Sequence, residues 1–252
     1  MLRTNSLAAG FTTAFVWAAV LMGATAGVAR ADGADRGGNN EVPRIVILGA
    51  SYAKGWSPSG LPGVEFVNQG VSGEQSDEML ARFDRDVATL RPDSVVLWGF
   101  INDIFRAPKA EIVERLARTK EDFGTMIARA RGAGIRPILA TEVTIRHKAG
   151  WMEDVHARVG RLLGRASYQD YVNGHVRAVN AWLRELARTE SLLLLDFENV
   201  VSGADGARRV EYAQEDGSHI SPDGYVAIDR YAAPLLRAHA GSGAKRIADA
   251  SR

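Results

Sequence analysis

Two kinds of hydrophobic pattern alternate along the chain. Short apolar runs rich in β-branched residues are typical of strands that are buried on both faces of a parallel sheet. They predict strands at residues 44–49, 64–68, 94–99, 136–143 and 191–197. Longer segments repeat apolar residues every three or four positions, which is the period of an amphipathic helix. They predict helices at residues 75–90, 109–131, 174–189 and 221–239, the last with Ser221 as N-cap and Pro222 in its first turn.

The alternation of strands and helices indicates an α/β fold. Parallel strands joined by helices of this length form a doubly wound sheet with right-handed crossovers and helices on both faces. We therefore predict a three-layer α/β/α sandwich around a five-stranded parallel sheet. Ligands bind such sheets beyond the carboxyl ends of the strands, so the residues that follow each strand are the first candidates for a site.

The N-terminal segment differs from the rest of the chain. Arg3 is followed by an apolar, small-residue-rich run at 7–28, and Ala29-Arg30-Ala31 matches the pattern of a signal-peptidase site. We predict a signal peptide at 1–31, a flexible leader at 32–42, a domain at 43–240 and a disordered tail at 241–252. The protein would then be periplasmic or secreted. An uncleaved membrane anchor is the alternative, because the run is almost long enough to span a bilayer.

Composition narrows the chemistry. The 252 residues are 46% hydrophobic and 24% charged, as in a globular protein with a full core, and the net charge is +1. So small a net charge does not favour binding to nucleic acid, and we expect no stable membrane insertion after signal cleavage. The chain has no cysteine, which excludes thiol catalysis, disulfides and thiolate metal sites. A nucleophile must therefore be oxygen or nitrogen.

Polar clusters follow the predicted strands and precede the last helix. They lie at residues 49–52, 68–73, 99–103 and 216–219. A serine hydroxyl needs a base to become nucleophilic, and the base needs a carboxylate to fix its tautomer. Ser51, His219 and Asp216 can fill these roles. The N–H groups of Ser51 and Gly73 and the side-chain amide of Asn102 can serve as an oxyanion hole.

These clusters resemble the conserved blocks of the SGNH or GDSL hydrolases, from about residue 43 to the final helix. The matching segments read GASY, NQGVSGEQS, GFINDIF and EDGSHISPDGY. The resemblance implies that Ser51 is the nucleophile, that Gly73 and Asn102 contribute to the oxyanion hole, and that Asp216 and His219 complete the triad. It also implies a flavodoxin-like fold, a small-molecule acyl ester or thioester as substrate, and no metal or organic cofactor.

Two residues depart from the family pattern. Ala50 replaces the usual aspartate of the first block, so the turn must be braced differently. Phe100 takes the usual glycine position of the third block, where a bulky side chain can narrow the pocket or shift Asn102. By size and block order the chain is most similar to the exported thioesterase and lysophospholipase group of the family, whereas other members deacetylate carbohydrates.

Other interpretations stay open. Ser72 or Asp196 could act in place of the assigned residues, although the serines show no Gly-x-Ser-x-Gly elbow. A metal site could use the acids and imidazoles near the fourth strand, namely Glu142, His147, Glu153, Asp154 and His156. The long segment 144–171 could be a lid over the site or a packed surface helix. The chain could also be a binding or assembly module that has lost turnover.

Overall fold

A computed structural model of the protein describes residues 42–58, 61–146 and 167–250. In these residues a parallel sheet has the strand order β2-β1-β3-β4-β5. The strands are β1 (Arg44–Gly49), β2 (Glu65–Gly70), β3 (Ser94–Trp98), β4 (Arg136–Ala140) and β5 (Leu193–Leu195). The register places Gly49, the last residue of β1, opposite Gly70 on one side and opposite Trp98 on the other. The strand order reverses at β1, so the crevice of a doubly wound sheet lies between β1 and β3.

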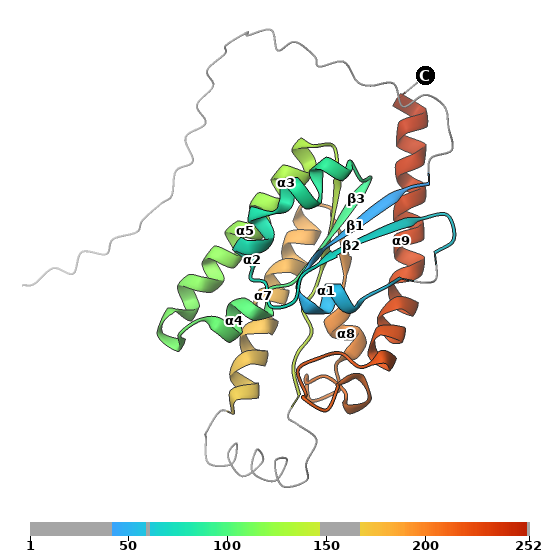
Figure 1. Ribbon diagram of the computed structural model, residues 1–252. Helices are drawn as coiled ribbons and strands as arrows, with labels where there is room; N and C mark the ends of the chain where they lie inside the picture. Colours follow the sequence, from blue (N-terminus) through green and yellow to red (C-terminus); the bar gives the residue numbers. More distant parts are fainter. Residues whose placement is uncertain (1–41, 59–60, 147–166, 251–252) are drawn as a thin grey trace, which may run out of the picture. The chain divides into compact units, whose positions relative to one another are not determined.

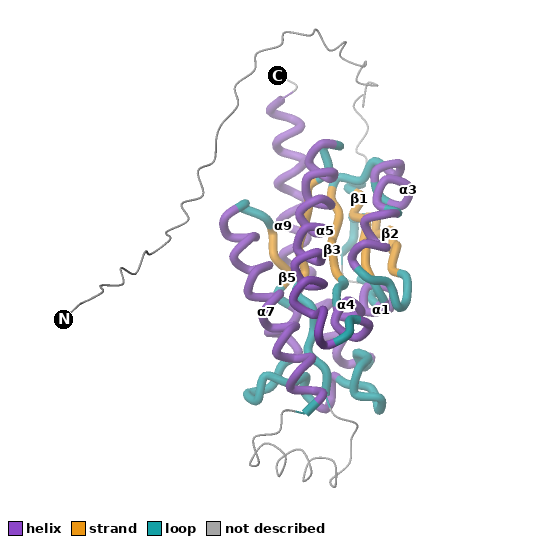
Figure 2. Tube along the Cα trace, turned by 90° about the vertical axis from the view of Figure 1, so that its left-hand side faces the viewer, coloured by secondary structure: helices purple, strands orange, loops and turns teal. Residues whose placement is uncertain are grey.

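Helices cover both faces of the sheet (Figures 1 and 2). On one face lie α2 (Ser76–Ala81), α3 (Phe83–Asp86), α5 (Ile112–Gly132) and α7 (Tyr168–Thr189), with the short α4 (Ile101–Arg106) packed against α5 and α7. On the other face lie α1 (Ser51–Gly55), α8 (Phe197–Val201) and α9 (Pro222–Ala250). Single turns of 3-10 helix occur at Ala88–Leu90, Lys109–Glu111 and Val210–Tyr212. The predicted three-layer sandwich is confirmed.

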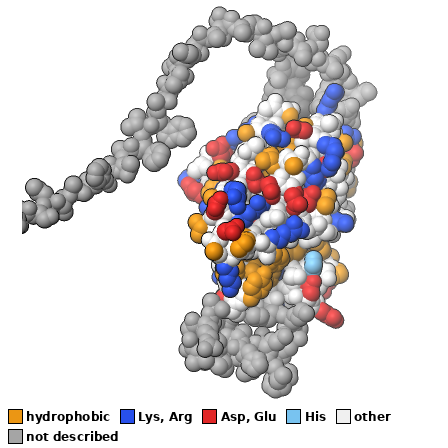
Figure 3. Space-filling model, turned by 60° about the vertical axis from the view of Figure 1, so that its left-hand side comes forward, with side chains coloured by type: hydrophobic (Ala, Val, Ile, Leu, Met, Phe, Trp, Pro, Cys, Tyr) orange, Lys and Arg blue, Asp and Glu red, His pale blue; other side chains and the backbone are white. Residues whose placement is uncertain are grey.

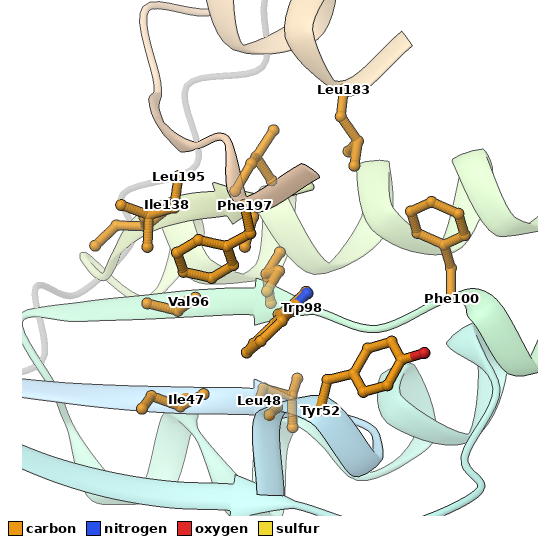
Figure 4. Packing of buried hydrophobic residues seen from close by; sticks show 14 of the residues in the cluster. Ile47, Leu48, Tyr52, Val96, Trp98, Phe100, Ile138, Leu183, Leu195 and Phe197 are labelled. Atoms are coloured by element: carbon orange, nitrogen blue, oxygen red, sulfur yellow. The ribbon is translucent and has the colours of Figure 1, made fainter. Parts of the chain in front are cut away.

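The core lies between the sheet and its two helical layers. Every residue of β3 is buried, because this central strand has a helical layer on each face. Trp98 at its carboxyl end lies between Tyr52 and Phe197 (Figure 4), with ring centroids 6.1 and 4.7 Å away. These tilted and edge-on contacts are favourable aromatic geometries. The core therefore extends up to the edge where the candidate residues lie.

The helix predicted at 75–90 is divided into α2, α3 and a 3-10 turn. The division occurs at Arg82, whose backbone leaves the helical region. Its side chain is turned inward and donates a hydrogen bond to the Gly49 carbonyl, 33 residues away. Long-range pairing of a charged side chain therefore overrides the local helical pattern.

The other boundaries differ by smaller amounts. β4 ends at Ala140 instead of 143, and α7 begins at Tyr168 instead of 174, because Ser167 and Asp170 form a capping box. Ser221 accepts a hydrogen bond from the Gly224 N–H at 3.2 Å, which confirms it as the N-cap of α9. α9 continues past the predicted end at 239 to Ala250 and so includes most of the segment predicted as a disordered tail.

The predicted signal peptide and nearly all of the predicted leader lie outside the described residues. Within the described ranges, no helix has both the length and the hydropathy that crossing a membrane requires. On the face shown in Figure 3, acidic and basic side chains are interspersed. That mixture agrees with the small net charge of the chain.

The central strand should contribute strongly to stability. Val96 on β3 is completely buried, whereas Val113 on α5 is 79% exposed. Val96→Ala removes two buried methyl groups and leaves a cavity, so we expect it to lower the free energy of unfolding by about 2 kcal/mol. Val113→Ala makes the same chemical change at the surface and should change stability by less than about 0.5 kcal/mol. Urea denaturation of both variants measures the difference, and equal effects would contradict the described burial.

Candidate active site

The turn after β1 carries the predicted nucleophile. Backbone hydrogen bonds join the turn to both neighbouring strands, from Ala50 N to Trp98 O (3.3 Å) and from Val71 N to Gly49 O (2.9 Å). A Cβ atom on Gly49 would lie 1.9 Å from the Trp98 carbonyl oxygen, so only glycine fits. Ser51 follows as the first residue of α1 and is partly exposed. The sheet itself thus places Ser51 at its carboxyl edge.

Arg82 braces this turn in the absence of an aspartate at position 50. Its side chain is 6% exposed and donates to the Gly49 carbonyl at 3.2 Å. The same guanidinium binds the carboxylate of Glu74 at 2.6 to 2.8 Å, which ties the first block to the loop after β2. Ala50 is itself buried and lies against Gly99. Sequence reasoning missed Arg82, because nothing in its local pattern points to a partner in the turn.

Gly73 and Asn102, which are predicted to contribute to the oxyanion hole together with Ser51, are held close together. Gly73, in the loop after β2, has a φ of +83°, a conformation that favours glycine. Asn102, in the first turn of α4, donates one side-chain N–H to the Glu74 carbonyl at 2.9 Å. An amide has two N–H donors, so this bond orients the side chain and leaves the second donor for a ligand. Glu74 therefore links the second and third blocks through its backbone.

A buried carboxylate, that of Glu142, supports the start of α4. Glu142 is one of the alternative metal ligands considered from the sequence. Glu142 follows β4, is completely buried, and accepts hydrogen bonds from the N–H groups of Phe100 (2.8 Å) and Ile101 (3.2 Å). These are helix-terminal donors that would otherwise lack partners. The Phe100 side chain is fully buried and packs edge-on against Phe123, with ring centroids 6.2 Å apart. The core accommodates its bulk.

Asp103, the neighbour of Asn102, fixes the first turn of α4 from the other side. Its carboxylate is completely buried and accepts hydrogen bonds from Arg115 at 2.6 and 2.9 Å. Thr119 donates at 2.7 Å and the backbone N–H of Ser76 at 3.0 Å. A buried charge that is both paired and hydrogen-bonded is well compensated. These bonds tie the turn of α4 that carries Asn102 to both α2 and α5.

Asp216 and His219 form one tight turn before α9. The Asp216 Oδ2 atom lies 2.5 Å from His219 Nδ1, while Oδ1 accepts the N–H groups of Ser218 (2.8 Å) and His219 (2.9 Å). Partial burial alone would raise the pKa of Asp216, but the hydrogen bonds from the His219 ring and the two backbone N–H groups outweigh it and hold the pKa well below its usual range. The ionised carboxylate assigns the ring proton to Nδ1 and leaves Nε2 as an acceptor.

Contacts of Tyr52 bring this turn next to Ser51. The rings of Tyr52 and His219 meet edge-on with centroids 6.3 Å apart, and the Tyr52 hydroxyl donates to the Ser218 carbonyl. Ser51 directly precedes Tyr52, so the predicted nucleophile and base come from adjacent segments. A hydrogen bond between the Ser51 and His219 side chains is not among those of the described residues. Such bonds are often long in enzymes without substrate.

A pocket of about 390 Å³ opens beside the turn, between the end of α1 and the start of α9. Gln214 and Ile220, which flank the Asp216–His219 turn, contribute to its wall. Neither Ser51 nor His219 lines it. It therefore borders the predicted catalytic residues without containing them.

The alternative residues take other positions. Asp196 is held by Arg184 in a two-pronged ion pair at 2.7 and 2.9 Å, and Ser72 is exposed in the turn before Gly73. Of the alternative metal ligands, all but Glu142 lie outside the described residues, as does the 147–166 portion of the predicted lid. Across the described ranges, no group of three or more potential ligands is arranged to hold a metal ion.

Glu142 should give stability a distinct pH dependence. Burial raises its pKa to about 7 from the ordinary 4.5, although the N–H groups of Phe100, Ile101 and Val143 favour ionisation. The folded state binds this proton more tightly than the unfolded chain, so the stabilisation is full below about pH 4.5 and is lost as pH rises through about 7. Glu142→Gln cannot ionise, so we expect its free energy of unfolding to fall between pH 5 and pH 8 by up to about 3 kcal/mol less than that of the native protein.

Urea unfolding at pH 5 and pH 8 measures this effect. Glu121→Gln, at an exposed position on α5, is the matched control and should keep the native difference between the two pH values. If Glu142→Gln also kept that difference, the buried carboxyl would not be its source.

Comparison with known proteins agrees with this architecture. The GDSL-like lipase from Bacteroides thetaiotaomicron is 21% identical, with a TM-score of 0.59 and coverage of 81% of this chain and 91% of that one. The lipase/acylhydrolase from Enterococcus faecalis is 22% identical, with a TM-score of 0.54 and coverage of 78% and 96%. A catalytic mutant of an acetylxylan esterase from Geobacillus stearothermophilus is 18% identical, with a TM-score of 0.52 and coverage of 75% and 91%. At these identities the similarity establishes the fold.

The family follows from the sequence itself. Among curated proteins, none matches the chain significantly. The sequence pattern of the GDSL-like lipase/acylhydrolase family matches residues 24–227, which is most of the chain. The protein therefore belongs to the GDSL-like lipase/acylhydrolase family and is a carboxylic ester hydrolase.

Proposed function

We propose that this hydrolase cleaves acyl esters and thioesters through a triad of Ser51, His219 and Asp216 and an acyl-enzyme intermediate. The observation that carries the proposal is the 2.5 Å contact between Asp216 and His219, in a turn that packs against the residue after Ser51. This is the order of groups that activates a serine hydroxyl, namely a carboxylate, an imidazole and a hydroxyl.

Each group has a defined task in the proposed reaction. His219 Nε2 accepts the proton of Ser51 as Oγ bonds to the acyl carbon, and the carbonyl oxygen becomes an oxyanion. The imidazolium then protonates the leaving alcohol or thiol as its bond to the acyl carbon breaks. Water, deprotonated by His219, attacks the acyl-enzyme, and the proton returns to Ser51 when the acid leaves. Asp216 stabilises the imidazolium and keeps the ring oriented.

Three donors are proposed to bind the oxyanion, namely the N–H groups of Ser51 and Gly73 and the Asn102 side chain. The bond from Asn102 to the Glu74 carbonyl supports this role, because it leaves one amide N–H unused. The positive φ of Gly73 supports it as well, since this conformation can turn a loop N–H toward a bound anion. Preorganised donors of this kind stabilise charge that develops only during the reaction.

Neither departure from the family pattern argues for a catalytically silent module. The turn that carries Ala50 is braced by Arg82 instead, and the Phe100 side chain is buried in the core. A second candidate substrate is an O-acetylated carbohydrate, because one structural relative is an acetylxylan esterase. For the site of action we propose export by the N-terminal segment, on the strength of its apolar run and its Ala-Arg-Ala end.

Hydrolysis of p-nitrophenyl esters from acetate to palmitate, by the protein from Asp32 onward, tests the triad. We expect Ser51→Ala and His219→Ala each to abolish turnover, because one removes the nucleophile and the other the base. Asp216→Asn should lose less, since the carboxylate mainly orients the ring. Ser72→Ala, an exposed serine near the same edge, should retain activity.

Native-like activity in Ser51→Ala would refute the assignment, and inactivity of the unaltered protein toward every ester and toward acetylated xylan would favour a binding module. The preferred chain length distinguishes the two substrate classes. An optimum at acetate points to deacetylation, and an optimum at longer chains points to lipid-derived esters.

Asn102 gives a separate test of the oxyanion hole. Asn102→Ala removes one donor, and we expect kcat to fall roughly a hundred- to a thousandfold with KM nearly unchanged, because the bond strengthens in the transition state. Steady-state kinetics on the best ester of the series measure both constants. A change in KM alone would instead indicate a role in ground-state binding. Asn199→Ala, a surface asparagine on α8, is the control.

A further inference from the structure

Tyr52 occupies an unusual place beside the predicted nucleophile. It is the second residue of α1 and only 3% exposed, and the centroid of its ring lies 6.1 Å from that of the Trp98 indole and 5.2 Å from the Arg208 guanidinium carbon. Figure 4 shows the ring beyond the carboxyl end of β1, beside Trp98. A phenol buried this deeply needs partners for its hydroxyl.

Those partners lie on two distant segments. The Tyr52 hydroxyl donates to the Ser218 carbonyl, 166 residues further along the chain, and accepts from Arg208 Nη2 at 3.0 Å. Arg208 is completely buried and its Nε donates to the Thr144 carbonyl at 2.9 Å. The phenol therefore connects the element that begins with Ser51 to the turn that contains His219.

The charged and ring side chains of the turn are only partly packed. The side chains of Asp216 and His219 are 41% and 49% exposed, so packing fixes them only in part. Backbone N–H groups hold the carbonyls on either side of Ser218, from Arg146 to Gly217 (2.8 Å) and from Gln214 to His219 (2.9 Å). The Ser218 carbonyl between them is held by Tyr52. Of these three hydrogen bonds, only the one from Tyr52 comes from α1, the helix that begins with Ser51.

We propose that Tyr52 is a positioning residue, whose hydroxyl, held by Arg208, sets the distance and orientation of the Asp216–His219 turn relative to Ser51. The inference rests on the triad proposed above. Tyr52 does not touch the reacting atoms, and no proton moves through it. It acts by fixing the Ser218 carbonyl, between Asp216 and His219, so that His219 Nε2 stays aligned with the serine hydroxyl.

The protonation of the phenol suits this role. Burial raises the pKa of Tyr52, even though Arg208 favours the ionised form, so the hydroxyl remains a donor throughout the neutral range. With its single proton given to Ser218, the oxygen can only accept from Arg208, and the direction of both bonds is fixed. Because the directions of both hydrogen bonds are fixed, the hydroxyl can hold a partly exposed turn in one position.

Tyr52→Phe removes the hydroxyl and keeps the buried ring. We expect kcat for the best p-nitrophenyl ester to fall roughly ten- to a hundredfold with KM within twofold, because misalignment of a base affects the chemical step. The rate of inactivation by a fluorophosphonate should fall by a similar factor. Tyr231→Phe is the matched control, since its hydroxyl accepts from Asp196 N, which lies outside the Asp216–His219 turn. It should remain near the native rate.

A double variant separates positioning from general destabilisation. If Tyr52 acts through the Asp216–His219 turn, Tyr52→Phe should cost clearly less in an Asp216→Asn background than in the native one. The inference would be overturned if the two substitutions lowered kcat by independent, multiplying factors, or if Tyr52→Phe left kcat unchanged. The proposed function would still stand in either case, provided that the activity depends on Ser51. If the activity of the protein did not depend on Ser51, so that Ser51→Ala was as active as the unaltered protein, the proposed function would be refuted instead, whatever Tyr52→Phe does.

Discussion

The position of β1 between β2 and β3 is the constraint on which the carboxyl edge of the sheet depends. It places Gly49 so close to the Trp98 carbonyl of β3 and to Ala53 of α1 that no side chain fits there. The backbone of the following turn is bonded to the ends of those strands, at Trp98 and Val71. Ser51 thus owes its place to main-chain pairing rather than to contacts of its own side chain. A buried parallel sheet is rigid, and so is the site that it carries.

Buried ionisable side chains below this edge hold the remaining loops. Arg82 joins the turn after β1 to the loop after β2, and Glu142 joins the segment after β4 to the start of α4. Asp103 is anchored by Arg115 on α5. Burying a charge costs free energy unless the group is paired and hydrogen-bonded, and each of these groups has such partners. Here the same arrangement that compensates the charges also fixes the loops.

Much of the fold could be predicted from the sequence, because β-branched apolar runs and helical periodicity report burial locally. Helices α1, α4 and α8 were not predicted, since five or six residues are too few to show a period. The positions of the four polar clusters followed from the parallel sheet, and the Asp216–His219 contact from a spacing of three residues. Arg82 reaches Gly49 across 33 residues, Glu142 reaches Phe100 across 42, and Arg208 reaches Thr144 and Tyr52 across 64 and 156; no local pattern encodes these pairs. The signal peptide and the lid remain predictions.

The turn at Asp216 and His219 also bears on how the protein folds. Its hydrogen bonds join residues two or three apart, so the turn can form as soon as that stretch of chain is free to bend. The contact between Tyr52 and Ser218 spans 166 residues, about two thirds of the chain, and requires the closure of that whole segment. Contacts of such long range form late and slow the folding of a domain. An emerging chain would thus complete its acid–imidazole pair only after every strand of the described sheet has been synthesised, and the final helix follows it.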